Sequence, residues 1–329
     1  MGSSRASNCR DGFEALTQGV ARLQEGSVSV GFLGGEDHLS WLQGQVTQDL
    51  RELQVGEVVW SCLCTRSGML RAVLRVGRTV EGLLVASDAD GLDAVEDLVR
   101  GSVFLEDVTW SRCHAPAAAF LRGPGSDPLV ESLGVPSEVS AWRGTLVGAS
   151  GAAIRYDFGG LTGWDLFSEG SFESDWGEQF GGLPPVRPET WEAVRRAAGI
   201  PTTGLDWDDK TLPPELGPQF ESAAISYAKG CYVGQEVLMR IYARGHVNWI
   251  RRGLFLSSEV ERGARVQDLE GQDIGHVQSV ANSLAHGWIA SARVRRSAAE
   301  PDSRVRVVSG DSQAGGVVTD FPFPRRPAS

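Results

Sequence analysis

The sequence predicts a protein of mixed helices and strands in two or three domains, the last of which is all-β. A chain of 329 residues is too long for one ordinary hydrophobic core. Its first half alternates strand-like and helix-like segments, whereas short β-like runs separated by glycines follow from about residue 250. We therefore expect residues 250–329 to form a separate β-sandwich or β-barrel.

The N-terminal part is predicted to begin with a tail and to continue as helices and strands. Residues 1–12 are polar and lack the apolar core of a signal peptide, so we expect a flexible tail. Apolar residues at positions 13, 16, 20 and 23 mark one face of a first helix, and a longer helix fits residues 88–100. Further expected segments are a helix at 36–43 and strands at 27–33, 57–64, 69–76, 80–86 and 102–109.

The central part contains the clearest helix signal of the chain. This helix begins at Pro188, and Gly199 and Pro201 end it. A short helix is expected from about Gln235, because Gly234 frees the chain to turn. The remaining segments expected here are a loop at 123–128, a strand-rich stretch at 145–167 and a loop at 168–188.

Composition and charge exclude several classes of function. The sequence is 41% hydrophobic and 22% charged, which fits a soluble globular protein, and no apolar run approaches the roughly 20 residues of a membrane helix. A net charge of −11 disfavours strong direct binding of nucleic acid. The five cysteines show neither a disulfide framework nor zinc-ligand spacing. We expect a cytoplasmic protein without a metal site.

Two of the cysteines, Cys62 and Cys64, lie two residues apart in an alternating apolar run. Residues two apart on a strand point to the same face, so a paired role is conceivable. The simpler interpretation is that both are small strand residues, and we favour it.

The segment from Tyr227 to Tyr242 stands out by composition. It holds three of the four tyrosines and Lys229, one of only two lysines among 31 basic residues. The arginine side chain is planar and permanently charged, whereas the lysine ammonium is compact and its pKa can shift. A lysine in a chain that otherwise uses arginine indicates that an ammonium is needed here. A cation and a helix start next to Cys231 would favour its thiolate, although a buried structural cysteine is the alternative.

The stretch around this segment is also positively charged. Between residues 229 and 252 the ionised side chains sum to +4, on a chain that is otherwise acidic. Such an island suits a small anionic ligand, and a solvated basic face is the other interpretation.

Residues Lys229–Glu236, Lys-Gly-Cys-Tyr-Val-Gly-Gln-Glu, resemble the K-G-C-Y-x-G-Q-E motif of the YgfZ family. These are folate-binding relatives of the glycine-cleavage T-protein, the tetrahydrofolate-dependent aminomethyltransferase. Other blocks resemble family blocks in the same order along nearly the whole chain. They are Leu42–Asp49, the T-x-x-G turn Thr65–Gly68, Ala198–Pro201, the extension at Arg240 and Arg244–His246, and Gly275–Ser279.

The resemblance implies an α+β fold, the aminomethyltransferase-like folate-binding ring of three domains with a C-terminal β-barrel. Two interleaved domains would then occupy residues 13–249, and the barrel residues 250–329. It also implies binding of tetrahydrofolate or a related folate, and support of iron–sulfur cluster assembly or repair in client enzymes, linked in some bacteria to tRNA modification. The partners expected are thus folate and iron–sulfur client enzymes, and we expect a monomer.

The resemblance also implies the residues of the site. Cys231 and Lys229 would carry the chemistry. The residues expected to bind folate are Trp191, Tyr232, Gln235, Glu236 and Arg240, with aromatic rings for the pterin and Arg240 for the carboxylates of the glutamate tail.

Three positions depart from the family pattern. T-proteins carry an Asp-Asp pair just after the T-x-x-G turn, where this chain has Arg71 and Ala72. Many relatives have Glu before the Ala-Gly that ends the central helix, where this chain has Ala197. We therefore expect an accessory protein rather than a conventional enzyme, with a tetrahydrofolate-dependent aminomethyl or one-carbon transferase as the alternative.

Overall fold

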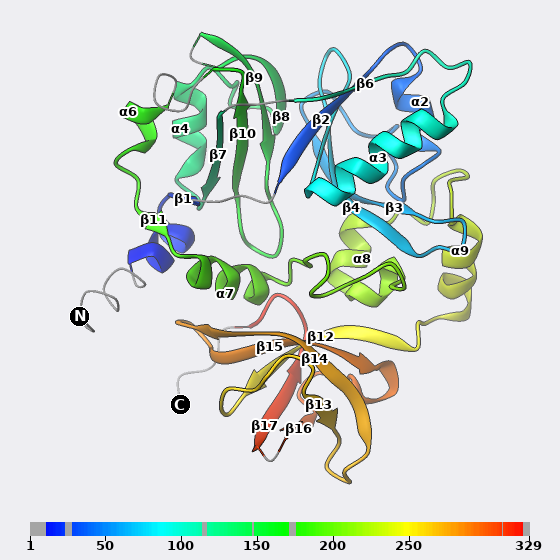
Figure 1. Ribbon diagram of the computed structural model, residues 1–329, viewed down its shortest axis with the longest axis vertical. Helices are drawn as coiled ribbons and strands as arrows, with labels where there is room; N and C mark the ends of the chain where they lie inside the picture. Colours follow the sequence, from blue (N-terminus) through cyan, green and yellow to red (C-terminus); the bar gives the residue numbers. More distant parts are fainter. Residues whose placement is uncertain are drawn as a thin grey trace. The chain divides into compact units, whose positions relative to one another are not determined.

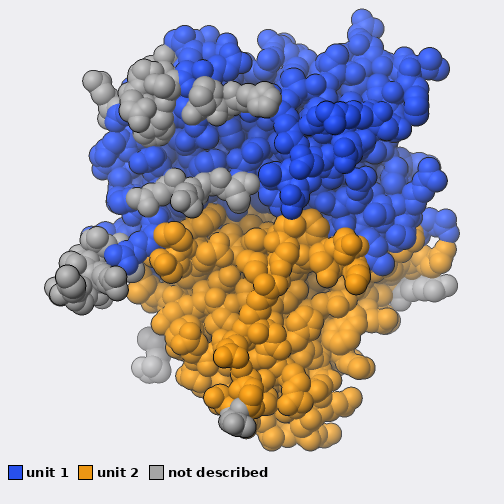
Figure 2. Space-filling view, viewed as in Figure 1, with its two compact units in different colours: residues 1–157, 161–187, 223–236 blue, residues 158–160, 188–222, 237–329 orange. Residues whose placement is uncertain are grey.

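A computed structural model describes residues 11–23, 28–113, 117–146, 148–170, 176–310 and 312–324. The chain forms two compact units, coloured separately in Figure 2. Unit 1 comprises residues 1–157, 161–187 and 223–236, and unit 2 comprises residues 158–160, 188–222 and 237–329. Most of the predicted tail lies outside the described residues.

Unit 1 contains a five-stranded antiparallel sheet in the order β3-β4-β5-β2-β6 (Figure 1). Helix α3 packs on β2, β4 and β5 and buries Leu92 and Val95 in the core of this sheet. Asp88 caps α3, because its side chain accepts a hydrogen bond from Gly91 N. The elements are β2 (Ser29–Gly34), α2 (His38–Gln43), β3 (Val58–Cys64), β4 (Leu70–Arg78), β5 (Leu83–Ser87), α3 (Ala89–Ser102) and β6 (Thr109–Arg112).

A second sheet of unit 1 has six strands in the order β11-β1-β7-β10-β9-β8. Its core includes Leu121, Trp164 and Leu166 from the strands and Val130 from α4. The elements are β1 (Ala21–Leu23), β7 (Ala117–Arg122), α4 (Ser126–Ser132), β8 (Ala141–Leu146), β9 (Ala149–Arg155), β10 (Gly163–Ser168), α6 (Gly177–Phe180) and β11 (Pro185–Val186).

Unit 2 contains a closed barrel in the order β12-β15-β14-β13-β16-β17. The barrel closes because β12 pairs with both β15 and β17, which decides between the sandwich and the barrel expected from the sequence. The remaining elements are α7 (Pro188–Ala198), η1 (Pro213–Leu216), α8 (Pro218–Ala224), α9 (Gln235–Arg244), β12 (Trp249–Leu256), β13 (Arg265–Gln267), β14 (Asp273–Ser283), β15 (Gly287–Arg295), η2 (Arg296–Ala298), β16 (Arg304–Ser309) and β17 (Ser312–Thr319). Two of these helices, α8 and α9, have residues in both units.

Most predicted elements are confirmed, and four predictions are wrong in part. The first helix ends at residue 18, because Ala21–Leu23 pairs instead with β7 and β11 as strand β1. The strand expected at 102–109 begins only at Thr109, and the predicted loops at 123–128 and 168–188 include the start of α4 and the whole of α6. The predicted domain division at residue 250 stays a prediction. Within the described part of the chain, no helix has the length and apolarity needed to cross a membrane.

Candidate functional site

The motif loop, residues 229–236, is anchored in unit 1 by a buried lysine. Lys229 is 5% exposed, and its Nζ donates hydrogen bonds to the carbonyl oxygens of Gln43 at 2.7 Å, Val46 at 2.6 Å and Gln48 at 2.8 Å. An ammonium has three donors, so these three acceptors satisfy it completely. Burial lowers the pKa of Lys229 to about 8, which still leaves the group protonated at pH 7. Lys229 therefore holds the backbone of residues 43–48 in place.

Further hydrogen bonds join the same two segments. Thr47 Oγ1 donates to Ala224 O at 2.6 Å, and Ser226 N donates to Thr47 O at 3.0 Å. Val233 N donates to Gly44 O at 3.1 Å. The family-like blocks at 42–49 and 229–236, far apart in the sequence, thus form one structural element.

The T-x-x-G turn lies against the same loop. Gly234 has φ +87°, and a Cβ at this position would lie 2.7 Å from Thr65 O and 3.2 Å from Gly68 Cα. The turn is closed by Gly68 N donating to Thr65 O at 2.9 Å. Only glycine permits both this backbone conformation and this close approach.

Cys231 is exposed at the surface of this frame. Gln235 Nε2 lies 3.4 Å from the carbonyl oxygens of both Lys229 and Gly230, which closes the loop on either side of the thiol. Glu236, next in the chain, is also exposed in the first turn of α9. The motif therefore presents a thiol and a carboxylate to solvent from a fixed backbone.

The other thiols near the motif are inaccessible. Cys62 and Cys64 are buried on β3, and burial raises the pKa of Cys62 and raises that of Cys64 to about 12. Tyr232 is also buried, with Lys229 Nζ 5.0 Å from its ring centroid. The burial of Cys62 and Cys64 supports their interpretation as small strand residues. The ring of Tyr232 is buried and does not lie on the surface of the loop.

The remaining predicted site residues belong to unit 2. Trp191 is half-buried in the first turn of α7, and Arg240 is exposed on α9. The structure describes each within that unit, so the grouping of Trp191 with Cys231 at one site stays a prediction.

Three cations of the +4 island read from the sequence do not contribute a free charge to the surface. Lys229 is buried, Arg251 is 1% exposed, and Arg252 Nη1 pairs with Asp320 Oδ1 at 2.6 Å. Burial also lowers the pKa of Arg251 to about 10. The sum of charges along the sequence is misleading here because Lys229 belongs to unit 1 and Arg251 to unit 2, and both are buried.

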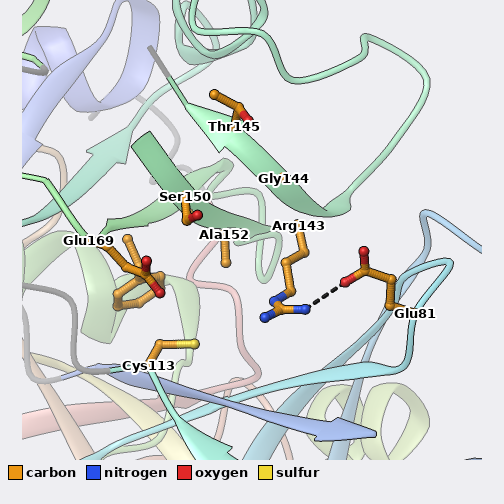
Figure 3. A pocket seen from close by; sticks show the side chains of 10 residues that line it. Glu81, Cys113, Arg143, Gly144, Thr145, Ser150, Ala152 and Glu169 are labelled. Carbon is orange, nitrogen blue, oxygen red and sulfur yellow. Dashed lines mark hydrogen bonds and ion pairs between the residues drawn. The ribbon is translucent and has the colours of Figure 1, made fainter. Parts of the chain in front are cut away.

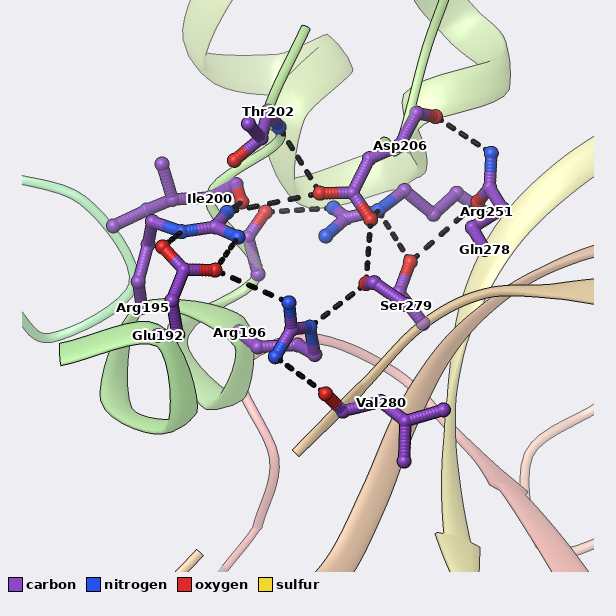
Figure 4. Close-up of polar contacts among 12 residues, drawn as sticks. Glu192, Arg195, Arg196, Ile200, Thr202, Asp206, Arg251, Gln278, Ser279 and Val280 are labelled. Carbon is purple, nitrogen blue, oxygen red and sulfur yellow. Dashed lines mark hydrogen bonds and ion pairs between the residues drawn. The ribbon is translucent and has the colours of Figure 1, made fainter. Parts of the chain in front are cut away.

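Asp206 is a buried acid of unit 2 that sequence reasoning missed. Figure 4 shows it at the centre of a polar network between α7 and the barrel. Its carboxylate accepts from Thr202 N at 3.0 Å and from Ser279 Oγ at 3.1 Å, while Arg196 Nε donates to Ser279 Oγ at 2.7 Å. Arg195 and Arg251 lie within 3.6 Å of the carboxylate. The network joins the blocks at 198–201 and 275–279, and no motif in the sequence marks its central acid.

A groove of about 280 Å³ in unit 1 lies apart from the motif loop (Figure 3). Arg143 spans it and pairs with Glu81 Oε2 at 2.5 Å. Glu169 and Cys113 also line the groove, and burial raises the pKa of the Cys113 thiol. Because its cation is paired and its thiol is protonated at neutral pH, we assign no chemistry to this groove. In the part of the chain that the structure describes, no cluster of three metal-ligating side chains occurs.

Known proteins similar to this chain include two named groups. The sequence matches no protein-family model. It is 24% identical over 298 residues to the tRNA-modifying protein YgfZ of Colwellia psychrerythraea, covering 89% of each chain. It is 27% identical over 303 residues to the YgfZ of Yersinia enterocolitica, covering 89% of this chain and 88% of the relative.

The second group consists of aminomethyltransferases. The chain is 26% identical over 317 residues to the aminomethyltransferase of Shouchella clausii, covering 89% of this chain and 83% of the relative. Among solved structures, it matches the glycine cleavage system aminomethyltransferase T of Bartonella henselae with a TM-score of 0.80 and 16% identity, covering 96% of this chain and 89% of that one. The predicted α+β, aminomethyltransferase-like fold class with a C-terminal barrel is confirmed.

Proposed function

Because the chain is a relative of the YgfZ proteins and has the fold of aminomethyltransferase T, we propose that it is a folate-binding accessory protein that supports iron–sulfur enzymes. The name of its relatives, tRNA-modifying protein, supports a link between those client enzymes and tRNA modification. Tetrahydrofolate or a related folate is the proposed ligand, and the cytoplasm is the proposed location.

One observation carries this proposal. The motif loop places Cys231 at the surface while Lys229, two residues earlier, is buried and hydrogen-bonded to three carbonyls. A frame that fixes the backbone and leaves one thiol accessible suits transient contact with a cluster or a client. A resident cluster does not fit, because it needs about four thiolates.

Two residues of unit 2 supply the groups that we propose for folate binding. Trp191 supplies an aromatic face for the pterin, and exposed Arg240 supplies a fork for the tail carboxylates. Position 197 supplies only a methyl group and therefore no acceptor for the pterin donors. A bound tetrahydrofolate would supply a one-carbon carrier.

Titration calorimetry with tetrahydrofolate tests the proposal directly. We expect binding to the wild type, and affinity about fivefold to tenfold lower in Trp191→Phe and in Arg240→Gln. Trp288→Phe, a tryptophan of the barrel, is the matched control and should bind as the wild type does. Absence of binding at about 1 mM ligand would contradict the folate proposal.

A one-carbon transferase is the second candidate, and one observation argues against it. Arg71 is exposed and Ala72 is buried at the start of β4, directly after the T-x-x-G turn where T-proteins carry their acid pair. Without a carboxylate there, the chain lacks the group tied to transfer in that enzyme. An assay of one-carbon transfer from an aminomethyl donor to tetrahydrofolate, with ammonia as the leaving group, distinguishes the two. Turnover above background would favour the transferase.

A further inference from the structure

The exposed apolar side chains of unit 1 are not scattered. Among its described residues, four large apolar side chains are more than half exposed: Val55 at 53%, Val80 at 88%, Phe104 at 81% and Leu105 at 98%. Single exposed apolar residues are common on protein surfaces and need no explanation. A group of exposed apolar side chains in one place indicates a surface that binds another molecule.

The strand register places all four at one end of the five-stranded sheet. The start of β3 pairs with the end of β4, and the start of β5 pairs with the ends of both β4 and β2. The start of β6 pairs with the end of β2 in the same way. The loops that precede β3, join β4 to β5 and precede β6 therefore project from the same end, and they carry these side chains. We call this set of loops, residues 54–57, 79–82 and 103–108, the apolar end.

The loop that carries Phe104 and Leu105 is held in a fixed conformation. Glu106 Oε2 accepts from Phe104 N at 3.0 Å and from Leu105 N at 3.1 Å. Asp107 N donates to Asp37 Oδ2 at 2.9 Å, which ties the loop to the end of β2. Because hydrogen bonds fix the backbone beneath the two exposed side chains, the loop is pre-organised to present them.

The charge carried by these loops is negative, although Glu81 is paired with Arg143. The exposed ionised residues of the apolar end and of residues 35–37 are acidic: Glu36, Glu57, Glu81, Glu106 and Asp107. No lysine or arginine occurs in these loops. An acidic rim repels anionic lipid and a second copy of this chain, whose net charge is −11. It attracts a basic surface.

We propose that the apolar end is a docking surface for a protein partner whose apolar pocket is rimmed by lysine and arginine. Phe104 and Leu105 are the anchors that enter the pocket, and the carboxylates pair with its rim. This surface does not depend on folate binding.

Site-specific photo-crosslinking in the cells that make the protein tests this proposal. Benzoylphenylalanine is placed at position 105 of the full chain and, as the matched control, at position 284, where Leu284 is 58% exposed on the barrel. We expect a protein adduct at position 105 that is absent at 284. No protein adduct above the control, an adduct with lipid, or an adduct with a second copy of this chain would overturn the proposal.

Binding to the purified crosslinked partner provides the second measurement. We expect the affinity of the Phe104→Ser/Leu105→Ser double variant to fall about tenfold or more, and that of Leu284→Ser to stay unchanged. Binding should also weaken as ionic strength rises, because the rim charges become screened. Equal affinity of the double variant and the wild type, or affinity insensitive to salt, would overturn it.

Discussion

At the scale of single residues, the most informative contact is that of Lys229. Its three hydrogen bonds converge on carbonyl oxygens at positions 43, 46 and 48. A tetrahedral ammonium matches three converging acceptors, whereas a planar guanidinium does not. This explains why a chain that uses arginine for nearly every cation keeps a lysine here.

Replacing Lys229 should therefore destabilise the protein even when the charge is kept. We expect Lys229→Met to lower the free energy of unfolding by about 2–4 kcal/mol, because three buried carbonyls lose their donor. Lys229→Arg should also destabilise, because the larger fork does not fit. Urea unfolding measures both, with Lys210→Arg as the exposed-lysine control. Wild-type stability in Lys229→Arg would show that charge alone is needed.

Cys231 should behave in the opposite way. We expect Cys231→Ser to leave the free energy of unfolding within about 0.5 kcal/mol of the wild type, because the side chain is exposed. The same variant should fail to restore iron–sulfur enzyme activity in a strain that lacks the gene. Cys113→Ser is the control thiol and should restore activity. Full restoration by Cys231→Ser would reduce that residue to a loop position without chemistry.

At the scale of elements, the site is built where three loops meet. The motif loop contacts the Thr65–Gly68 turn through the backbone at Gly234, and it contacts the 43–48 segment through Lys229 Nζ and Val233 N. A residue with a side chain could not replace Gly234, because the backbone of the Thr65–Gly68 turn lies too close for a Cβ. The two glycines of the motif therefore have different roles: Gly234 is required by close packing, whereas Gly230 is not.

Substitution of the two motif glycines tests this difference. Gly234→Ala should destabilise by about 2–3 kcal/mol, because its φ is positive and its Cβ would lie 2.7 Å from Thr65 O. Gly230→Ala is the matched control, since a Cβ there meets nothing within 4 Å. Thermal or urea unfolding measures both changes. Equal stability of the two variants would contradict the packing described here.

At the scale of the whole molecule, the described part of each unit contains a buried aspartate held between arginines. In unit 1, Asp165 pairs with Arg75 and with Arg122 Nη2 at 2.6 Å. In unit 2, Asp206 lies between Arg195 and Arg251. Burial alone would raise both pKa values, but the neighbouring guanidinium groups outweigh it and hold them below the ordinary value. Both carboxylates are therefore ionised in the folded protein.

These two groups predict acid sensitivity. A carboxyl with a lowered pKa in the folded state stabilises the fold above its unfolded pKa of about 3.9, and this contribution is lost as pH falls through the folded value. We expect the urea midpoint to be steady near neutral pH and to fall below about pH 4. Asp165→Asn should be less stable at pH 7 and should lose less on acidification. An equal acid-induced loss in variant and wild type would contradict this assignment.

How far the sequence predicted the fold depends on whether local signals decided each element. Helix α7 was predicted correctly because Pro188 and Gly199 delimit it locally. Strand β1 was missed because its three residues take their conformation from β7 and β11. For the motif, the sequence indicated a reactive thiol at Cys231 with a buried structural cysteine as the alternative, and the structure shows the thiol exposed. Neither the burial of Lys229 nor the buried network around Asp206 has a local signal.

The sequence by itself determined the family resemblance, the aminomethyltransferase-like fold class and the identity of the motif residues, because these depend on residue types and their order. Only the tertiary structure decided which of those residues face solvent. Lys229, Tyr232 and Arg251 are buried, whereas Cys231, Glu236 and Arg240 are exposed. The physical reason is that burial is set by partners distant in the chain, such as the carbonyls at 43–48 that enclose the ammonium of Lys229.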